Sequence, residues 1–169
     1  MLFDKPFVTE PIRNLMAKGI DSRFAIVLLY DELPEDHLNK IPFDLLLEAC
    51  QRAPRNSEVK NHILNRLWSL VKNKNFEERL EVYRQSDPES ELEEFILKDL
   101  WNSAKTSRER IEVCNRTKPG SELEKITVEY VAGLEAPFEL WLEVYEKSRR
   151  GKIRDKAFEK MRECAKRLL

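Results

Sequence analysis

Glycine is scarce in this chain of 169 residues, and long apolar runs are absent. Four glycines are far fewer than the ~7 % that is usual in proteins, which argues against a turn-rich β protein and against a glycine-rich phosphate loop. No apolar run approaches the ~18 residues that span a membrane. Charged residues and proline interrupt the first seven positions, unlike the apolar core of a signal peptide. We therefore expect a soluble, cytoplasmic protein with no membrane partner.

Cysteine and histidine are also too few for most metal or disulfide chemistry. Cys50, Cys114 and Cys164 are widely spaced and form no C-x-x-C pair, which fits neither a disulfide framework nor a zinc site and favours a reducing compartment. His37 and His62 are the only histidines and leave little for a metal site or a general base. We expect no metal, no cofactor and no enzymatic activity. A cysteine nucleophile served by a distant histidine is the alternative.

The balance of charge argues against nucleic acid as the partner. The chain carries 30 Lys and Arg against 31 Asp and Glu, whereas binding through phosphates requires a clustered basic face. The C-terminal segment is rich in basic residues, but Asp and Glu are interspersed among them. Those basic residues are Arg154, Lys156, Lys160, Arg162, Lys166 and Arg167.

A repeat of about 31 residues organises most of the chain. The segment FEERLEVY, which starts at Phe76, is echoed by FELWLEVY from Phe138, by SRERIEVC from Ser107 and more loosely by FDLLLEAC from Phe43. The apolar residue before the shared Glu falls 33, 31 and 31 residues apart along the chain. Those anchor residues are Leu47, Leu80, Ile111 and Leu142. Their spacing predicts four copies of one structural unit.

Each unit is predicted to be two helices joined by a short turn. A proline-containing turn ends in Ser57, Ser90 or Ser121, and the last two have Glu three residues later, which is the spacing of a capping box. Asn75 and Thr106 open the next units with the same spacing. The resulting hairpins cover residues 43–75, 76–106, 107–137 and 138–169. Residues 1–42 lack the repeat and are predicted to form an N-terminal helical cap, with helices near 11–17, 21–31 and 34–40.

This pattern resembles the α-solenoid families, and the spacing and the capped second helix are HEAT-like. The resemblance covers residues 43–169 as a pattern and identifies no specific family. It implies an all-α fold, namely a right-handed α-solenoid of stacked antiparallel hairpins with a divergent N-terminal cap. It also implies a concave surface for a partner.

Two rows of repeat positions test the helical phase. We expect Leu47, Leu80, Ile111 and Leu142 to be buried. The neighbouring carboxylates should be solvent-exposed and paired within their own helix to Arg52, Arg84, Arg116 and Lys147. Those carboxylates are Glu48, Glu81, Glu112 and Glu143. A row of four carboxylates that binds cations is the alternative reading.

Three tryptophans are the candidate contacts to a partner. Trp68 and Trp101 hold equivalent positions in successive second helices, and Trp141 stands in a first helix where other units have Leu46, Arg79 or Arg110. Packing is the simpler explanation for all three, but exposed tryptophans would act as binding anchors. The sequence therefore favours a non-catalytic scaffold that binds a protein or peptide. A nucleic-acid-binding HEAT-like module is the alternative, followed by an enzyme built like the HEAT-like DNA glycosylases.

Overall fold

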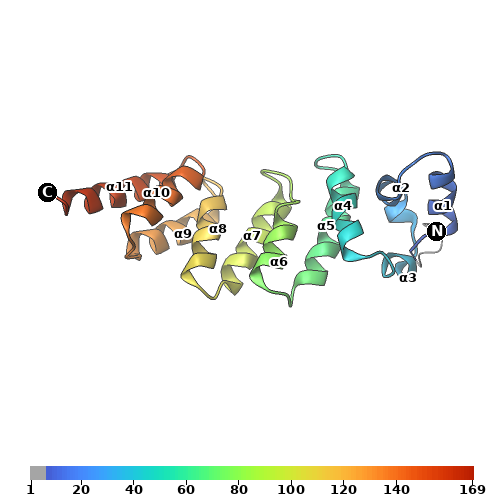
Figure 1. Ribbon diagram of the computed structural model, residues 1–169, viewed down its shortest axis with the longest axis horizontal. Helices are drawn as coiled ribbons and strands as arrows, with labels where there is room; N and C mark the ends of the chain where they lie inside the picture. The colour runs from blue at the N-terminus through green and yellow to red at the C-terminus, as the bar shows by residue number, and fades with distance from the viewer. Residues whose placement is uncertain (1–6) are drawn as a thin grey trace. The chain divides into compact units, whose positions relative to one another are not determined.

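The computed structural model describes residues 7–169, and within them every regular element is a helix (Figure 1). The predicted all-α class is confirmed, and no helix of this part of the chain is long and apolar enough to cross a membrane. The first elements are α1 (Glu10–Ala17), α2 (Ser22–Leu29), the 3-10 helix η2 (Tyr30–Glu32) and α3 (Glu35–Leu38). They are followed by α4 (Phe43–Arg52), α5 (Glu58–Val71), α6 (Phe76–Tyr83), α7 (Glu91–Ser103), α8 (Ser107–Arg116), α9 (Glu122–Gly133), α10 (Phe138–Lys147) and α11 (Lys152–Lys166).

Each predicted repeat contains its two helices, and the turns inside three of them share one backbone conformation. The residue before the capping serine has a positive φ in each turn: 56° at Asn56, 65° at Glu89 and 82° at Gly120. The hydroxyls of Ser57 and Ser121 then accept the backbone N–H three residues ahead, at 3.2 Å in both turns. The left-handed residue reverses the chain and the serine starts the next helix, so these turns come from local sequence alone.

Most predicted helix ends are confirmed. Asn75 and Thr106 form complete capping boxes with Glu78 and Glu109. At Ser121 the box is only half formed, because the Glu124 carboxylate accepts the N–H of Gly120 instead of the serine N–H.

The N-terminal segment follows the same rules at two of its helix ends. The Asp21 carboxylate accepts the N–H groups of Arg23 and Phe24 at the start of α2. Gly19, with φ 87°, ends α1: its N–H donates to Met16 O, and the Ile20 N–H donates to Leu15 O. This pair of bonds is a Schellman motif, which requires a left-handed residue at the Gly19 position.

The chain divides into two compact units, one ending at Leu92 and the other spanning Glu93–Leu169. In the first unit α2 packs on α1 and α4, and α5 packs on α4 and α6. Its core is apolar, and the largest side chains within it are fully shielded from solvent. They include Ile12, Ile26, Leu46, Ile63 and Leu67. Helix α2 thus contacts α4 of the first hairpin, and η2 contacts α5.

In the second unit two successive hairpins pack against each other. Helix α8 contacts α10, and α9 contacts α11, while α8–α9 and α10–α11 each form a hairpin. One buried cluster joins all four helices: Ile111, Cys114, Val131, Trp141, Val144, Ile153 and Ala157. The period of the apolar residues therefore corresponds here to contacts between neighbouring hairpins.

The two test rows agree with the structure only in part. Leu80 and Ile111 are 1 % exposed as predicted, but Leu47 is half-buried and Leu142 is 36 % exposed, so the predicted burial is wrong for these two. The four glutamates are half-buried instead of fully exposed, which corrects the predicted solvation. Neighbouring helices cover part of each glutamate, and a helical wheel drawn for one segment does not include those neighbours.

Three of the four predicted intrahelical ion pairs are present. Glu81–Arg84, Glu112–Arg116 and Glu143–Lys147 are separated by 2.7, 2.5 and 2.8 Å. The fourth is wrong, because Glu48 pairs with Arg23 of α2, and Arg52 lies 3.7 Å from Asp21. Here a charge from the N-terminal cap replaces the neighbour in the same helix.

Candidate peptide-binding cleft

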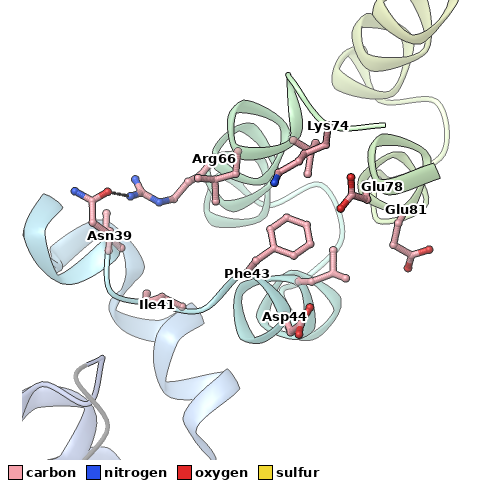
Figure 2. A pocket seen from close by; sticks show the side chains of 12 residues that line it. Asn39, Ile41, Phe43, Asp44, Arg66, Lys74, Glu78 and Glu81 are labelled. Atoms are coloured by element: carbon pink, nitrogen blue, oxygen red, sulfur yellow. Dashed lines mark hydrogen bonds between the residues drawn. The ribbon is translucent and has the colours of Figure 1, made fainter. Parts of the chain in front are cut away.

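A cleft of about 610 Å³ opens in the first unit (Figure 2). Its walls are the α3–α4 connection, one side of α4, the C-terminal half of α5 and one side of α6. Its volume lies within the ~300–1,000 Å³ range of ligand clefts. We call it the α4–α6 cleft, and its lining residues are Leu38, Asn39, Ile41, Phe43, Asp44, Leu47, Arg66, Leu70, Val71, Lys74, Glu78 and Glu81.

The centre of the α4–α6 cleft is apolar. Phe43 and Leu47 are one helical turn apart on α4, and both are half-buried. Leu70 of α5, which is 47 % exposed, lines the same cleft beside the buried Val71. Helix α5 already buries a full apolar stripe, so Leu70 lies outside that stripe and presents its side chain to the cleft. An exposed leucine inside a concave, apolar surface is typical of a binding site.

Charged groups surround this apolar centre, with carboxylates concentrated at one end. Glu78 and Glu81 project from α6, and Asp44 of α4 adds a third carboxylate to the lining (Figure 2). Glu81 is partly neutralised by Arg84 at 2.7 Å. Lys74 belongs to the connection between α5 and α6, and Figure 2 shows its ammonium directed toward the cleft. A ligand in this cleft therefore meets apolar groups at its centre and charges of both signs at its margin.

At the opposite end, Arg66 is the centre of a hydrogen-bond network. This guanidinium donates to the Glu35 carboxylate at 2.9 Å and to the Asn39 side-chain oxygen, both from the α3 region. On the same side of α5, His62 Nδ1 lies 2.7 Å from Asp31 Oδ1. These contacts connect η2 and α3 to α5 at the end wall of the α4–α6 cleft.

Tyr30 belongs to the same network. Burial raises the pKa of its phenol, although the Arg66 guanidinium acts in the opposite direction. The phenol therefore stays protonated at neutral pH, and the neighbouring wall of the cleft carries no additional negative charge.

The three tryptophans predicted as binding anchors occupy different environments. Trp68 and Trp141 are buried, at 7 % and 1 % exposure, and the Trp141 indole N–H donates to Ala136 O at 3.1 Å. Trp101 is half-buried, and its ring meets that of Tyr130 edge-on at 5.4 Å. None of the three lines the α4–α6 cleft. Their role in protein binding stays a prediction, and the packing described here accounts for two of them.

An arginine stacks on each of the two equivalent tryptophans. The Arg79 guanidinium lies 5.0 Å from the Trp68 ring, and the Arg110 guanidinium lies 5.5 Å from the Trp101 ring. Both arginines hold the position that Trp141 occupies in the last hairpin. This repeated cation–π contact joins the second helix of one hairpin to the first helix of the next.

The turns between helices carry buried ion pairs that the sequence reading missed. Lys60 Nζ donates to Asp87 Oδ1 at 2.6 Å, and the Asn56 N–H donates to the other oxygen at 2.7 Å. Burial alone would raise the pKa of Asp87, but these two hydrogen bonds hold it below its usual value. In the second unit the buried Glu93 pairs with Arg149. Both side chains of the Lys60–Asp87 pair are buried, so this pair acts in structure, because its groups are not accessible to a ligand.

Reactive or metal-binding groups do not gather in the described region. Between residues 7 and 169, no three His, Cys, Asp or Glu side chains lie close enough to hold a metal ion. The three cysteines are free. Burial raises the pKa of the Cys50 and Cys114 thiols to about 11 and about 12, which suppresses the reactive thiolate.

No protein-family model matches this chain, and no curated protein or solved structure shows significant similarity to it. Its function must therefore be argued from its own surface. The sequence reading did not select the residues of the α4–α6 cleft. One signal was available: Leu70 is apolar but lies off the stripe formed by Val59, Ile63, Leu67 and Val71. An apolar residue beside a complete stripe suggests either a second contact or an exposed site.

Proposed function

We propose that this chain is a non-catalytic scaffold that binds a peptide segment of another protein in the α4–α6 cleft. The observation that carries the proposal is the exposed Leu70, which lines with Phe43 a concave surface that is apolar at its centre and charged at its margin. A side chain such as Leu or Phe in the partner would fill the centre. Polar groups of the peptide would meet Lys74 and the carboxylates of α4 and α6.

The proposal includes a scaffold of the α-solenoid type, with right-handed stacking of its hairpins. Three features support it: the common conformation of the turns, the repeated tryptophan–arginine contact, and the packing of α8 on α10 and of α9 on α11. A cytoplasmic location is part of the same proposal, because three free thiols suit a reducing compartment.

The proposal is tested by selecting peptides against the full chain from a displayed library of short peptides. A selected peptide should shift the backbone NMR signals of Phe43, Leu70 and Lys74. Leu70→Glu places a carboxylate in the apolar centre and should weaken that peptide at least about 10-fold, which corresponds to roughly 1.4 kcal/mol. Leu70 is 47 % exposed near the end of α5, so the new carboxylate stays in contact with water and the helix should remain folded.

Leu28→Glu is the matched control. Leu28 is a leucine of the same unit, is 51 % exposed on α2, and does not line the cleft. Its substitution should leave peptide affinity unchanged. Selected peptides that bind Leu70→Glu as well as the unaltered chain would contradict the proposal, and so would signal shifts confined to the second unit.

Nucleic acid is the competing partner, and a binding assay with fluorescent nucleic-acid probes tests it. Several basic groups of α11 already have partners: Arg154 lies 4.6 Å from the Tyr145 ring, and Lys156 pairs with Glu159 at 2.5 Å. We therefore expect fluorescent single-stranded DNA and RNA probes to show no binding at physiological salt. Binding that falls steeply as salt is raised would favour the nucleic-acid module instead.

A further inference from the structure

The second unit contains an ion pair between two first helices that has a counterpart in the α4–α6 cleft. Arg108 is the second residue of the repeated segment in α8, and Glu143 is the sixth residue of that segment in α10. Both terminal nitrogens of the Arg108 guanidinium donate to the Glu143 carboxylate, at 2.9 and 2.8 Å. This two-bond geometry is strong and is specific for a guanidinium.

The same two positions of the first unit are both acidic. Asp44 is the second residue of the segment in α4, and Glu81 is the sixth residue of the segment in α6. Both line the α4–α6 cleft, one from each helix (Figure 2). The first unit therefore keeps the carboxylate of the ion pair but has an aspartate at the position of the arginine.

The Glu81 carboxylate can accept a second cation. Its contact with Arg84 at 2.7 Å lies within one segment of the chain. Glu143 has a comparable contact with Lys147 at 2.8 Å and still accepts both hydrogen bonds from Arg108. The Glu81 side chain is 42 % exposed, against 23 % for Glu143, as expected for a carboxylate that no arginine of a neighbouring helix covers. The local ion pair of Glu81 therefore leaves room for a guanidinium.

The charge of the whole lining favours one additional cation. Three carboxylates and two basic side chains line the α4–α6 cleft, so their net charge is −1. Arg66 already donates to Glu35 and Asn39 at the opposite end of the cleft. Lys74, on the connection between α5 and α6, is the other cation. A guanidinium beside Asp44 would neutralise the lining, whereas a carboxylate of a ligand would increase its negative charge.

We propose that the peptide bound in the α4–α6 cleft carries an arginine next to its apolar anchor, and that Asp44 and Glu81 bind the guanidinium of this arginine. This assignment rests on the proposed function, since it names the class of peptide that the same cleft binds. The apolar anchor lies at the centre with Phe43 and Leu70. The guanidinium takes the role that Arg108 has between α8 and α10.

Peptides selected against the full chain from a displayed library test this preference. Those that Leu70→Glu weakens bind in the cleft, and they should share an arginine close to their apolar anchor. Replacing that arginine by alanine in the peptide should weaken binding about 10-fold at physiological salt. Cleft-binding peptides without a basic residue, or with an acidic residue that pairs with Lys74, would overturn the assignment and leave the proposed function intact. If no selected peptide is sensitive to Leu70→Glu, the proposed function fails and the assignment fails with it.

Variants of the chain identify the carboxylates that bind the arginine. Asp44→Asn and Glu81→Gln each remove one negative charge at nearly constant volume. Each should weaken the arginine-containing peptide about 5-fold and leave the affinity for its alanine version unchanged. Asp44→Arg reproduces the arrangement of the second unit, so the chain itself then occupies the acidic position. This variant should weaken the arginine-containing peptide at least about 10-fold.

Glu77→Gln is the matched control. Glu77 is an exposed carboxylate of α6 that does not line the cleft, so its neutralisation should leave the affinity for both peptides unchanged. Circular dichroism should show that all variants remain helical. If Asp44→Asn and Glu81→Gln bind the arginine-containing peptide as tightly as the unaltered chain, the assignment is wrong.

Discussion

The two compact units place a buried charge at the same repeat position, but they neutralise it differently. The third residue after the turn serine is Lys60 in the first unit and Glu93 in the second, and they are 7 % and 5 % exposed. Lys60 pairs with Asp87, and both side chains are buried. Glu93 pairs with Arg149, whose side chain is 31 % exposed and remains in contact with water. At these two positions the turn of another hairpin supplies the opposite charge, whereas Glu124, the buried residue at the same position after Ser121, accepts the backbone N–H of Gly120.

The strongest test of this comparison removes the partner of each buried charge. Asp87→Ala leaves the Lys60 ammonium and the Asn56 N–H without an acceptor in the interior, and it should destabilise the first unit by about 3–5 kcal/mol. Arg149→Ala should cost the second unit less, roughly 1–3 kcal/mol, because Glu93 loses a partner that is already partly solvated. Hydrogen exchange measured separately for amides of the two units gives both values.

The control for this test restores the pair in the opposite orientation. Lys60→Asp/Asp87→Lys should recover part of the stability lost in Asp87→Ala, although the Asn56 N–H then faces a cation. Equal losses for Asp87→Ala and Arg149→Ala would show that the burial of the partner does not matter.

The tryptophan–arginine contacts provide a second test. Trp68 is 7 % exposed beside the buried Arg79, whereas Trp101 is half-buried beside the exposed Arg110. Trp68→Ala should therefore cost about 3–5 kcal/mol, in the range of a large core truncation. Trp101→Ala should cost about 1–3 kcal/mol, because less apolar area leaves contact. Urea unfolding of each variant, followed by circular dichroism, measures the difference, and a larger loss for Trp101→Ala would contradict the assigned burial.

A smaller effect concerns the surface charges of the two units. Hydrogen bonds from Arg108 and Lys147 hold the pKa of Glu143 at about 2, below its ordinary 4.5. Stability from this carboxylate is fully present above pH 4.5 and is lost as the pH falls toward 2. Because Arg108 and Lys147 are largely solvated, we expect a contribution of about 0.5–1 kcal/mol.

Acid unfolding of Glu143→Gln checks this expectation. The variant should start less stable at pH 6 and lose less stability than the unaltered chain between pH 4.5 and 2. Glu81→Gln in the first unit is the comparison, since the Glu81 carboxylate accepts hydrogen bonds from Arg84 and Gln85 of its own segment. Identical acid profiles for the unaltered chain and Glu143→Gln would show that the Arg108–Glu143 ion pair does not contribute to stability.

The sequence predicted the helices well because their signals are local. The Asn75 and Thr106 capping boxes act over three residues, and the hairpin turns depend on four. Helix bounds followed directly from these short patterns. The burial of Leu80 and Ile111 also followed, because both lie at the centre of an apolar stripe.

Properties that depend on contacts between helices could not be predicted in this way. Glu48 pairs with Arg23 from a segment outside the repeat, and Asp87 looks like an ordinary turn residue until Lys60 is placed beside it. The α4–α6 cleft likewise requires α3, α4, α5 and α6 to be placed in space. Leu142 was predicted to be buried because a repeat suggests equal environments, yet its helix has an open side that α8 does not.

The tryptophan–arginine contacts also constrain the order in which hairpins can be joined. Segment 76–106 contains Arg79 in its first helix and Trp101 in its second. Its removal would bring Trp68 next to Arg110 and so keep one tryptophan and one arginine at the new contact. Removal of segment 107–137 would instead set Trp101 against Trp141, two bulky rings where one ring and one flat cation now stack. Thermal unfolding should show the first shortened chain to be cooperative and the second to have lost cooperativity. These contacts would then determine which hairpins can be deleted or duplicated without loss of cooperative folding.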